Sequence, residues 1–253
     1  MENQYMISPQ ELTSNNIYDR IAETYTLSFE TSYVQFLKNQ LLERFTRPSD
    51  VCLDVGIANG IFSIPISQKV REVHGIDISP KMLEQCRFNL GRQGVKNVFI
   101  YERSAANLMF PKESFDVVFS YSTLLLIPRP ERAYREIVHV LKPSGFAILD
   151  ITGKYNLSRV YWTKYYRQQG HFGLNYYTLS EISSIFNSLG FEILERHATG
   201  LLEQWKYIKG LRRLTFMDRF IHRAPHQPDL DYKLSQIFSA LANRWYFVLR
   251  KKR

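Results

Sequence analysis

Cysteine is scarce in this sequence of 253 residues, because only Cys52 and Cys86 are present. Cys52 falls in a predicted buried strand and Cys86 in a predicted helix, so a disulfide framework is not expected. Long apolar runs are also lacking: TLLLI (123–127) and FAILDI (146–151) are far too short to span a bilayer. The first ten residues have neither a basic end nor an apolar stretch, so no secretory signal is expected there. These features predict a protein of the reducing cytoplasm.

Acidic residues are scarce in the last fifth of the chain. From Gly200 on, twelve Lys and Arg residues stand against four acids, a net charge of +8 out of +9 for the whole chain. Such asymmetry marks either an anionic partner or a solvated helix face. Residues 201–223 are predicted to form a basic amphipathic helix that either contacts a membrane surface, holds an anionic substrate or packs over the domain. The predicted apolar stripe contains Leu201, Trp205, Ile208, Leu211 and Phe216.

Short apolar runs alternate with helical patterns in the middle of the chain. Helix 80–90 begins with Ser79 as N-cap and Pro80 at its first position, and the helix from about residue 130 is predicted to end at 142–145, where Pro143 and Gly145 occur. This alternation predicts a parallel sheet with helices on both faces. The expected buried strands, rich in Val, Ile and Phe, are 51–55, 72–77, 98–102, 115–121 and 146–151.

The pattern then continues with further helices and two more strands. We predict a doubly wound α/β sheet of seven strands. The later elements are expected at 178–190 (helix), 191–197 (strand), 201–223 and 230–243 (helices) and 244–252 (strand), and two helices are expected within 15–46. The predicted domains are an N-terminal helical lid (1–46), an α/β core (47–199), a basic helical insert (200–243) and the final strand of the core sheet (244–253).

A glycine-bearing turn follows the first predicted strand. Residues 53–60 read LDVGIANG, with the turn over 56–60. Such a turn offers backbone N–H groups and permits close approach of a ligand. A P-loop is excluded because the chain has no Gly-x-x-x-x-Gly-Lys-Ser/Thr string. A dinucleotide turn is disfavoured because Ala58 and Ile61 occupy two of the three positions where Gly-x-Gly-x-x-Gly requires glycine.

Two acids near this turn indicate a ligand that carries a positive charge. Asp54, just before the turn, is unfavourable beside a pyrophosphate but suits an ammonium group. Asp77 ends the second strand, where a carboxylate about 20 residues beyond the turn accepts hydrogen bonds from ribose hydroxyls. S-adenosylmethionine has an α-amino group, a sulfonium and an adenosine but no phosphate, so the methyl group of Ala58 is tolerated. Together with Gly56 and Gly60, these residues predict S-adenosylmethionine as the cofactor.

At this point the sequence resembles the class I S-adenosylmethionine-dependent methyltransferases, in particular the group that acts on small molecules (methyltransferase domain 11/25-like). The resemblance covers about residues 50–152, and it implies a Rossmann-like sheet that is mostly parallel with the last strand antiparallel. Four motifs stand in the family's order and spacing. They are the glycine turn, the second strand and helix HGIDISPKMLEQCR (74–87), the fourth strand with its helix from Ser114 on, and the turn KPSG (142–145), where the family has Lys-Pro-Gly-Gly.

The resemblance also implies which residues contact the cofactor. Two departures stand out: Ser104 replaces the acid that usually meets the adenine amino group, and the apolar string LLLI (124–127) replaces a histidine-bearing one. The N-terminal string IYDRIAETY (17–25) resembles a lid segment that covers the methionine end of the cofactor. The implied cofactor-binding residues are Asp54, Gly56, Ala58, Gly60, Asp77, Ile78, Ser104, Ala105, Ser120, Tyr18 and Tyr25.

Methyl transfer is an in-line displacement at a carbon that the sulfonium activates, so positioning and exclusion of water dominate and a general base is optional. Tyr121 and Ser122, at the carboxyl end of the fourth strand, are expected near the cofactor on geometry alone. Tyr121 is a candidate catalytic residue, with packing under a helix as the alternative. His171, in the aromatic-rich stretch 165–179, is a candidate base. No metal is expected.

The sequence predicts a methyltransferase with a small-molecule acceptor, and aromatic, glycan and lipid-linked acceptors stay open. An RNA methyltransferase that uses the basic end is the alternative, but the fourth strand lacks an Asn/Asp-Pro-Pro-aromatic string and no RNA-binding module is evident. We therefore expect no nucleic-acid partner. A protein that binds the cofactor without catalysis is the third hypothesis, because a fold alone does not establish function.

Overall fold

Seven strands form one sheet in the computed structural model, which describes residues 16–20, 22, 33–171, 173–208, 210–211 and 226–253. The strand order is β3-β2-β1-β4-β5-β7-β6. Only β7 runs against its neighbours, β5 and β6. This confirms the predicted Rossmann-like sheet with an antiparallel last strand. The strands are β1 (Val51–Val55), β2 (Glu72–Asp77), β3 (Val98–Glu102), β4 (Phe115–Ser120), β5 (Leu141–Thr152), β6 (Phe191–Thr199) and β7 (Arg244–Lys251).

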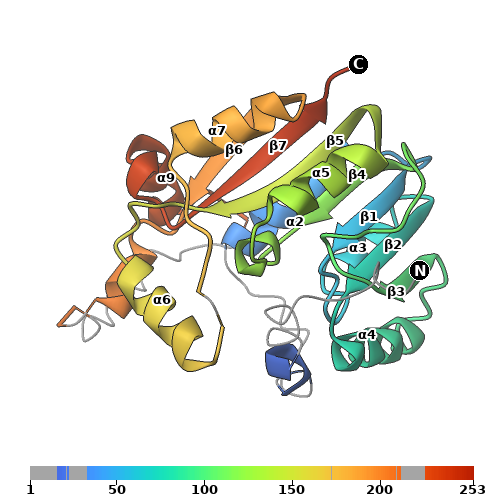
Figure 1. Cartoon of the computed structure of the whole chain (residues 1–253), viewed down its shortest axis with the longest axis horizontal. Helices are drawn as coiled ribbons and strands as arrows, with labels where there is room; N and C mark the ends of the chain where they lie inside the picture. The colour runs from blue at the N-terminus through green and yellow to red at the C-terminus, as the bar shows by residue number, and fades with distance from the viewer. Residues whose placement is uncertain (1–15, 21, 23–32, 172, 209, 212–225) are drawn as a thin grey trace, which may run out of the picture.

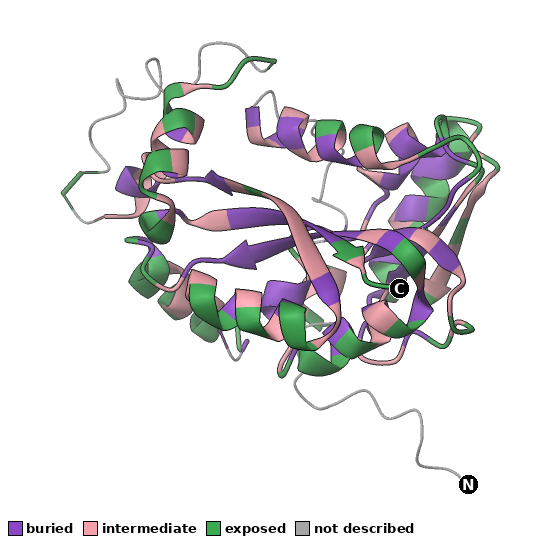
Figure 2. Ribbon diagram, turned by 90° about the horizontal axis from the view of Figure 1, so that it is seen from above, coloured by how far each residue is buried: buried purple, intermediate pink, exposed green. Residues whose placement is uncertain are grey.

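Helices cover both faces of the sheet, as Figure 1 shows for α5 in front and α2 behind. Side chains of α5 and α7 share one buried cluster with the strands, and α2 and α3 share another. Figure 2 shows the buried strands between two layers of helices whose outer sides are exposed. The helices are α2 (Tyr33–Phe45), α3 (Ser63–Ser67), α4 (Pro80–Arg92), α5 (Glu131–Val140), α6 (Arg159–Gln168), α7 (Leu179–Ser188) and α9 (Leu230–Ile237), with 3-10 turns η2 (Leu124–Leu126), η3 (Glu203–Tyr207) and η5 (Ser239–Leu241).

Local capping explains why two of these helices begin where the sequence predicts. The Ser79 hydroxyl accepts the N–H of Met82 at 3.1 Å, and Pro80 occupies the first position of α4. Thr178 and Glu181 form a reciprocal capping box at the start of α7. Each cap satisfies N–H groups that have no partner inside the helix, so the helix start is fixed by polar side chains rather than by packing.

The junction of α5 and β5 differs from the prediction. The helix ends at Val140 and the strand begins at Leu141, so residues 142–145 belong to β5 rather than to a helix end. Leu141 pairs with Phe115 of β4 before an irregularity in the ladder, and Ser144 has a left-handed φ of +63°. A Cβ on Gly145 would lie 2.8 Å from the carbonyl oxygen of Asp116. Close strand contact therefore explains this glycine.

The N-terminal and insert predictions are borne out only in part. Residues 16–20 and α2 are helical, and the residues between them lie mostly outside the described ranges. The predicted helix from 201 is wrong over the described residues 201–208 and 210–211, where the 3-10 turn η3 forms instead and Gly210 has a φ of +95°. All of 212–223, including Phe216, lies outside the described residues. The predicted helix 230–243 ends early, at Ile237, before η5.

No helix within the described ranges combines the length and the apolar character that crossing a bilayer needs.

Candidate functional site

A cavity of about 280 Å³ opens at the carboxyl ends of the central parallel strands. Ligands of open α/β sheets bind in this position, where the strand order reverses beside β1. Its walls come from the turn after β1, the end of β2, the stretch after β4, helix α6 and the segment 16–20. The lining includes Ile17, Tyr18, Gly56, Ala58, Ile76, Asp77, Ile78, Met82, Arg103, Ala105, Tyr121, Ser122, Thr123, Leu126, Ile127, Tyr165, Tyr166 and Gln169.

The glycine turn forms the floor of the cavity. Gly56 has a φ of +88°, and a Cβ built on it would lie 2.0 Å from the Thr123 Oγ1 atom. Only glycine fits here, both because the backbone is left-handed and because the stretch after β4 approaches closely. Ala58 also has a left-handed φ, +47°, and its N–H donates to Asp77 Oδ2 at 2.9 Å. That hydrogen bond offsets the strain of a non-glycine residue in this conformation.

Asp77 lies on the cavity wall at the end of β2, as the sequence predicts. Its two carboxylate oxygens accept N–H groups of Ser79, at 3.0 Å, and Ala58. Burial raises the pKa of Asp77, whereas these hydrogen bonds from N–H groups lower it. A carboxylate oxygen has more than one lone pair, so Asp77 can accept further hydrogen bonds from a diol in the cavity. This is the geometry expected for a ribose site.

Asp54 lies behind the turn rather than on the cavity wall. The carboxylate is buried and its Oδ2 atom accepts the hydroxyl of Ser63 at 2.7 Å, at the start of α3. Burial raises the pKa of Asp54 to about 7, against the lowering effect of the Ser63 hydrogen bond. Asp54 is not among the residues that line the cavity, so the structure does not place its carboxylate in direct contact with an ammonium group there. Gly60, with a φ of +89°, also lies outside the lining and packs near Cys86 and Ile64.

Other predicted cofactor residues divide into two groups. Ile78 and Ala105 line the cavity, whereas Ser104 and Ser120 do not. The Ser120 hydroxyl is buried and donates to the Val55 carbonyl at 2.8 Å, so it ties β4 to β1. The Ser104 hydroxyl oxygen accepts the N–H of Ala106 at 3.1 Å.

The lid segment contributes to the cavity through Tyr18 and Ile17. Tyr25, the other predicted lid aromatic, lies outside the described residues. Asp19 holds this segment against α4, because its carboxylate accepts the Ser79 hydroxyl at 2.6 Å. The segment is thus fixed to the same helix start that follows Asp77.

Neither candidate catalytic residue presents its reactive atom to the cavity. Tyr121 is a lining residue, but its hydroxyl donates to the Lys38 carbonyl of α2 at 3.1 Å, and burial raises its pKa well above the ordinary value. His171 is buried outside the lining, with Nδ1 2.8 Å from the Gly173 carbonyl oxygen and its ring 5.7 Å from that of Tyr166. Burial lowers the pKa of His171. Both geometries fit packing roles.

A buried ion pair that the sequence analysis missed supports the loop after β4. Asp150, fully buried at the end of β5, accepts the N–H of Ser122 at 2.9 Å and pairs with Arg244 at the start of β7. The Arg244 guanidinium also lies 3.4 Å from the Ser122 hydroxyl, and Ser122 has a left-handed φ of +60°. The sequence feature that indicates this pair is Asp150 inside the apolar run FAILDI, because a carboxylate in a buried strand requires a partner.

Helix α6 supplies cavity residues that the sequence analysis did not single out. Tyr165, Tyr166 and Gln169 line the cavity from α6 and its C-cap, and Figure 1 shows α6 on the opposite side of the molecule from β2, which carries Asp77. The aromatic-rich stretch after the fifth strand indicated these residues in the sequence, but His171 was the residue of that stretch that was predicted as a site residue. Arg103, a further missed residue, lies with its guanidinium 4.4 Å from the ring centre of Phe110 and donates to the Leu108 carbonyl at 2.8 Å.

The described residues contain no group of three His, Cys, Asp or Glu side chains placed to hold a metal ion.

Comparison with known sequences places a family match on the core of the sheet. Residues 53–149 match the family model described as a methyltransferase domain. Phosphoethanolamine N-methyltransferase 2 of Caenorhabditis elegans is 28% identical over 194 residues, which cover 73% of this chain and 44% of that protein. Phosphatidylethanolamine N-methyltransferase of Cereibacter sphaeroides is 32% identical over 98 residues, or 38% of this chain and 48% of that protein. The chain thus spans about half the length of these curated relatives.

Solved structures share the fold. The [4+2]-cyclase SpnF superposes with a TM-score of 0.68 at 17% identity and covers 98% of this chain and 97% of its own. Phosphoethanolamine N-methyltransferase 2 of Haemonchus contortus, in complex with S-adenosyl-L-methionine, has a TM-score of 0.68 at 23% identity and covers 98% of this chain and 61% of its own. One of these proteins is a cyclase, so the fold by itself does not fix the reaction.

Proposed function

We propose that this chain, whose residues 53–149 match the model of the methyltransferase domain family, is a class I S-adenosylmethionine-dependent methyltransferase that transfers a methyl group from that cofactor to a small-molecule acceptor. The observation that carries the proposal is a single cavity with two chemically different ends. Asp77 and the glycine turn line it from β1 and β2 at one end, and the tyrosines line it from α6, which Figure 1 shows on the opposite side of the molecule from β2.

The first end fits S-adenosylmethionine. Gly56 leaves no room for a Cβ beneath the cavity, and the Asp77 carboxylate stands on its wall with accepting capacity for ribose hydroxyls. Ile76, Ile78 and Met82 add apolar surface beside Asp77, as an adenine ring needs. When bound, the cofactor supplies a methyl group that its sulfonium already activates.

The second end indicates what kind of acceptor the chain takes. Tyr165 and Tyr166 offer aromatic faces, and Gln169 offers an amide. Flat rings and cationic amines both bind favourably to aromatic faces. No histidine is among the described lining residues. We therefore propose an acceptor whose nucleophile reaches the cavity with an available lone pair, such as a neutral amine or an already ionised oxygen, and the protein positions it and excludes water.

The test combines cofactor binding with transfer. Titration calorimetry of S-adenosylhomocysteine is expected to show binding to the wild type and at least about tenfold weaker binding to Asp77→Asn, because charge-assisted hydrogen bonds to the ribose are lost. Glu72→Gln, at the opposite end of β2, is the matched control and is expected to bind like the wild type. Equal affinity of Asp77→Asn and the wild type would contradict the ribose assignment.

Transfer is then measured with methyl-labelled S-adenosylmethionine and a panel of amines, phenols, carboxylic acids, glycans and lipid-linked acceptors, with an RNA mixture as a separate arm. Label in a small molecule that depends on Tyr165 and Tyr166 supports the proposal. Label in RNA alone would favour the nucleic-acid alternative. Tight cofactor binding without label in any arm would favour a cofactor-binding protein without catalysis.

A further inference from the structure

Helix α6 stands at the edge of the molecule beyond the carboxyl ends of the strands, as Figure 1 shows. None of its ten residues is buried. The rings of Tyr161 and Trp162 lie 4.9 and 4.8 Å from that of Tyr207 in η3, so this contact attaches one side of the helix to the rest of the protein. The side away from this contact is exposed to solvent, and Tyr161 at its border is itself 43% exposed.

That exposed side has an unusual composition. Val160 is 79% exposed and Leu157, just before the helix, is 56% exposed. Tyr161 and Tyr165 are exposed aromatics beside them. We call the set formed by Leu157, Val160, Tyr161, Lys164, Tyr165 and Arg167 the α6 surface. Isolated exposed apolar residues are ordinary, but contiguous ones next to aromatic and basic residues mark an interaction site.

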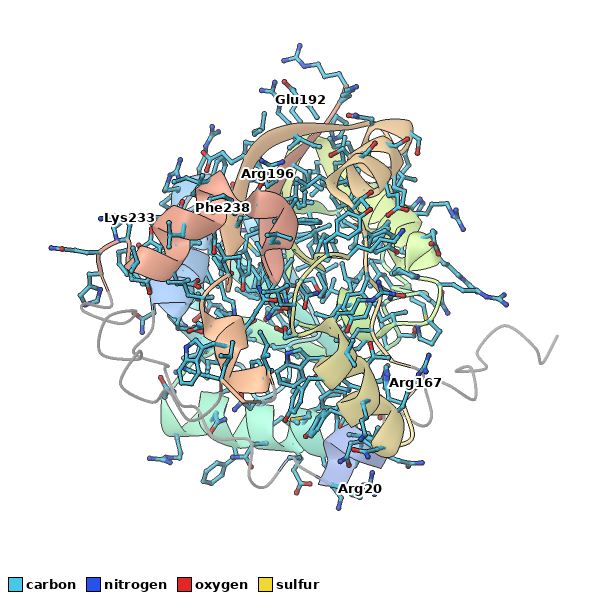
Figure 3. The ribbon with its side chains drawn as sticks, turned by 90° about the vertical axis from the view of Figure 1, so that its left-hand side faces the viewer. Arg20, Arg167, Glu192, Arg196, Lys233 and Phe238 are labelled. Atoms are coloured by element: carbon cyan, nitrogen blue, oxygen red, sulfur yellow. The ribbon has the colours of Figure 1, made fainter. Side chains whose placement is uncertain are left out.

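The charge of this region has one sign. Residues 151–180 contain no Asp or Glu, whereas Lys154, Arg159, Lys164 and Arg167 are all basic. Lys154 pairs with Glu181, and the Arg159 guanidinium lies over the Tyr176 ring. Lys164 and Arg167 form no ion pair with any residue that the structure describes. Figure 3 shows Arg167 and Arg20, from the segment 16–20, at the same lower end of the molecule.

We propose that the α6 surface docks on a lipid bilayer that carries anionic headgroups. Tyrosines and aliphatic side chains flanked by Lys and Arg are the composition that binds at the interface of such a bilayer. The aliphatic side chains distinguish this surface from a nucleic-acid site, because phosphate binding by Lys and Arg gains nothing from Leu157 and Val160. Charge complementarity favours this partner, since an anionic leaflet attracts Lys164 and Arg167, two cations that form no ion pair with any described residue.

The position of Tyr165 ties this surface to the cavity. Its side chain is 42% exposed on the α6 surface and also lines the cavity. Docking on α6 therefore brings the mouth of the cavity to the headgroups. The proposal goes beyond methyl transfer, because lipid binding can be measured on the full chain without cofactor or acceptor.

The test is flotation of the full chain with vesicles of phosphatidylcholine alone and with vesicles that contain phosphatidylglycerol as well. We expect the wild type to float with the anionic vesicles and to be released by added salt. Leu157→Ser with Val160→Ser removes the aliphatic part, and Lys164→Gln with Arg167→Gln removes the charge. Each pair is expected to weaken partitioning on the order of tenfold.

The matched control lies on α9, where Ile237 is 71% exposed and Phe238, just after the helix, is 52% exposed. Ile237→Ser with Phe238→Ser removes as much exposed apolar surface from another helix and is expected to float like the wild type. Thermal unfolding and S-adenosylhomocysteine binding of every variant show that it is folded. The two α6 pairs are independent, so one folded pair is enough to decide.

The proposal would be overturned if the wild type did not float with anionic vesicles, or if it floated equally well with neutral ones. It would also be overturned if the α6 variants floated like the wild type, or if the α9 variant lost as much vesicle binding as the α6 variants. A wild type that binds an RNA oligonucleotide and is thereby displaced from vesicles would instead assign the α6 surface to nucleic acid. Retained S-adenosylhomocysteine binding in all variants separates each of these results from a failure of the proposed function.

Discussion

The backbone N–H of Ala58 donates to the Asp77 carboxylate at 2.9 Å, and this hydrogen bond joins the turn after β1 to the end of β2. The middle residue of the turn is thus fixed by the same carboxylate that is positioned for a ribose. The relationship explains why alanine is acceptable at this position: its side chain meets no phosphate, and its N–H is already satisfied. The turn and the acid are therefore one structural unit, and we propose that this unit binds the cofactor.

Gly56→Ala tests the closest approach in this unit. The new Cβ would lie 2.0 Å from Thr123 Oγ1, so the turn must move, and we expect S-adenosylhomocysteine binding to fall at least about tenfold. Gly94→Ala is the matched control, because Gly94 also has a left-handed φ, +66°, but nothing lies within 4 Å of its Cβ position. This control is expected to cost about 1 kcal/mol of stability and to leave affinity unchanged. Equal affinities in the two variants would show that the turn is not in contact with the cofactor.

Asp54 is expected to make stability depend on pH. Burial raises its pKa to about 7 in the folded protein, above the usual value near 4 for an unfolded Asp. The folded state therefore holds a proton that the unfolded state releases, and the stabilisation is full below about pH 4 and is lost as pH rises through about 7. Asp54→Asn removes this contribution, so the stability of the wild type relative to the variant should fall by up to a few kcal/mol over that window.

Urea unfolding at several pH values measures this difference. Ser63→Ala provides the matched comparison, because it removes the hydrogen bond that lowers the Asp54 pKa. The pKa should then rise further, so the loss of stability should extend to higher pH. A wild type and an Asp54→Asn variant with parallel pH dependence would contradict the assignment.

The Asp150–Arg244 pair is expected to behave as a coupled unit beneath the loop after β4. Arg244→Met leaves a buried carboxylate without its cation, which costs about 3–5 kcal/mol, and should also weaken cofactor binding through Ser122. Adding Asp150→Asn should restore part of the stability, because the uncompensated charge is gone. A double-mutant cycle by urea unfolding gives the coupling, and strictly additive effects would argue against it.

Tyr121→Phe is expected to leave methyl transfer within about twofold of the wild type, because the hydroxyl contacts the Lys38 carbonyl rather than the cavity. Loss of that hydrogen bond should cost about 1 kcal/mol in thermal unfolding. Tyr134→Phe, in the buried cluster on the other face of the sheet, is a control for removing a buried hydroxyl. A loss of about 100-fold in turnover for Tyr121→Phe alone would instead identify a catalytic residue.

His171→Gln is expected to keep the shape of the pH–rate profile, because the ring is buried outside the cavity lining. His197→Gln serves as the control, since His197 contacts Tyr232 and Glu195 and is not among the lining residues. Disappearance of an ionisation from the profile of His171→Gln alone would restore His171 as a base.

The sequence predicted the seven strands because apolar runs mark them, and it predicted the start of α4 because Ser79 is a strong N-cap. The antiparallel direction of the last strand was implied by the family resemblance. The sequence misplaced the end of α5, since Pro143 and Gly145 indicate a helix end and also occur where a strand begins against Asp116. Helix 201–223 was predicted from spacing alone, and tertiary contacts of Trp205, which is buried, override that pattern in η3.

The structure brings the predicted site residues together where they belong to one βαβ unit. Gly56, Ala58 and Asp77 are close in sequence, so their spacing determines their geometry. Asp54 shows the limit of predicting site residues from spacing, because the direction in which the side chain of a strand residue points depends on the register of the sheet. Residues from distant elements, such as Arg244 and Tyr165, meet the site only through the fold, and no local pattern identifies them.

The place of β7 in the sheet affects how the chain is made. β7 is the last of the seven strands along the chain, yet it lies between β5 and β6. While the ribosome is still adding residues 244–251, β5 has an open edge and β6 has no neighbour to pair with. A nascent chain that lacks residues 244–251 therefore exposes two unpaired strand edges, and a chain truncated before residue 244 is expected to aggregate and to be degraded.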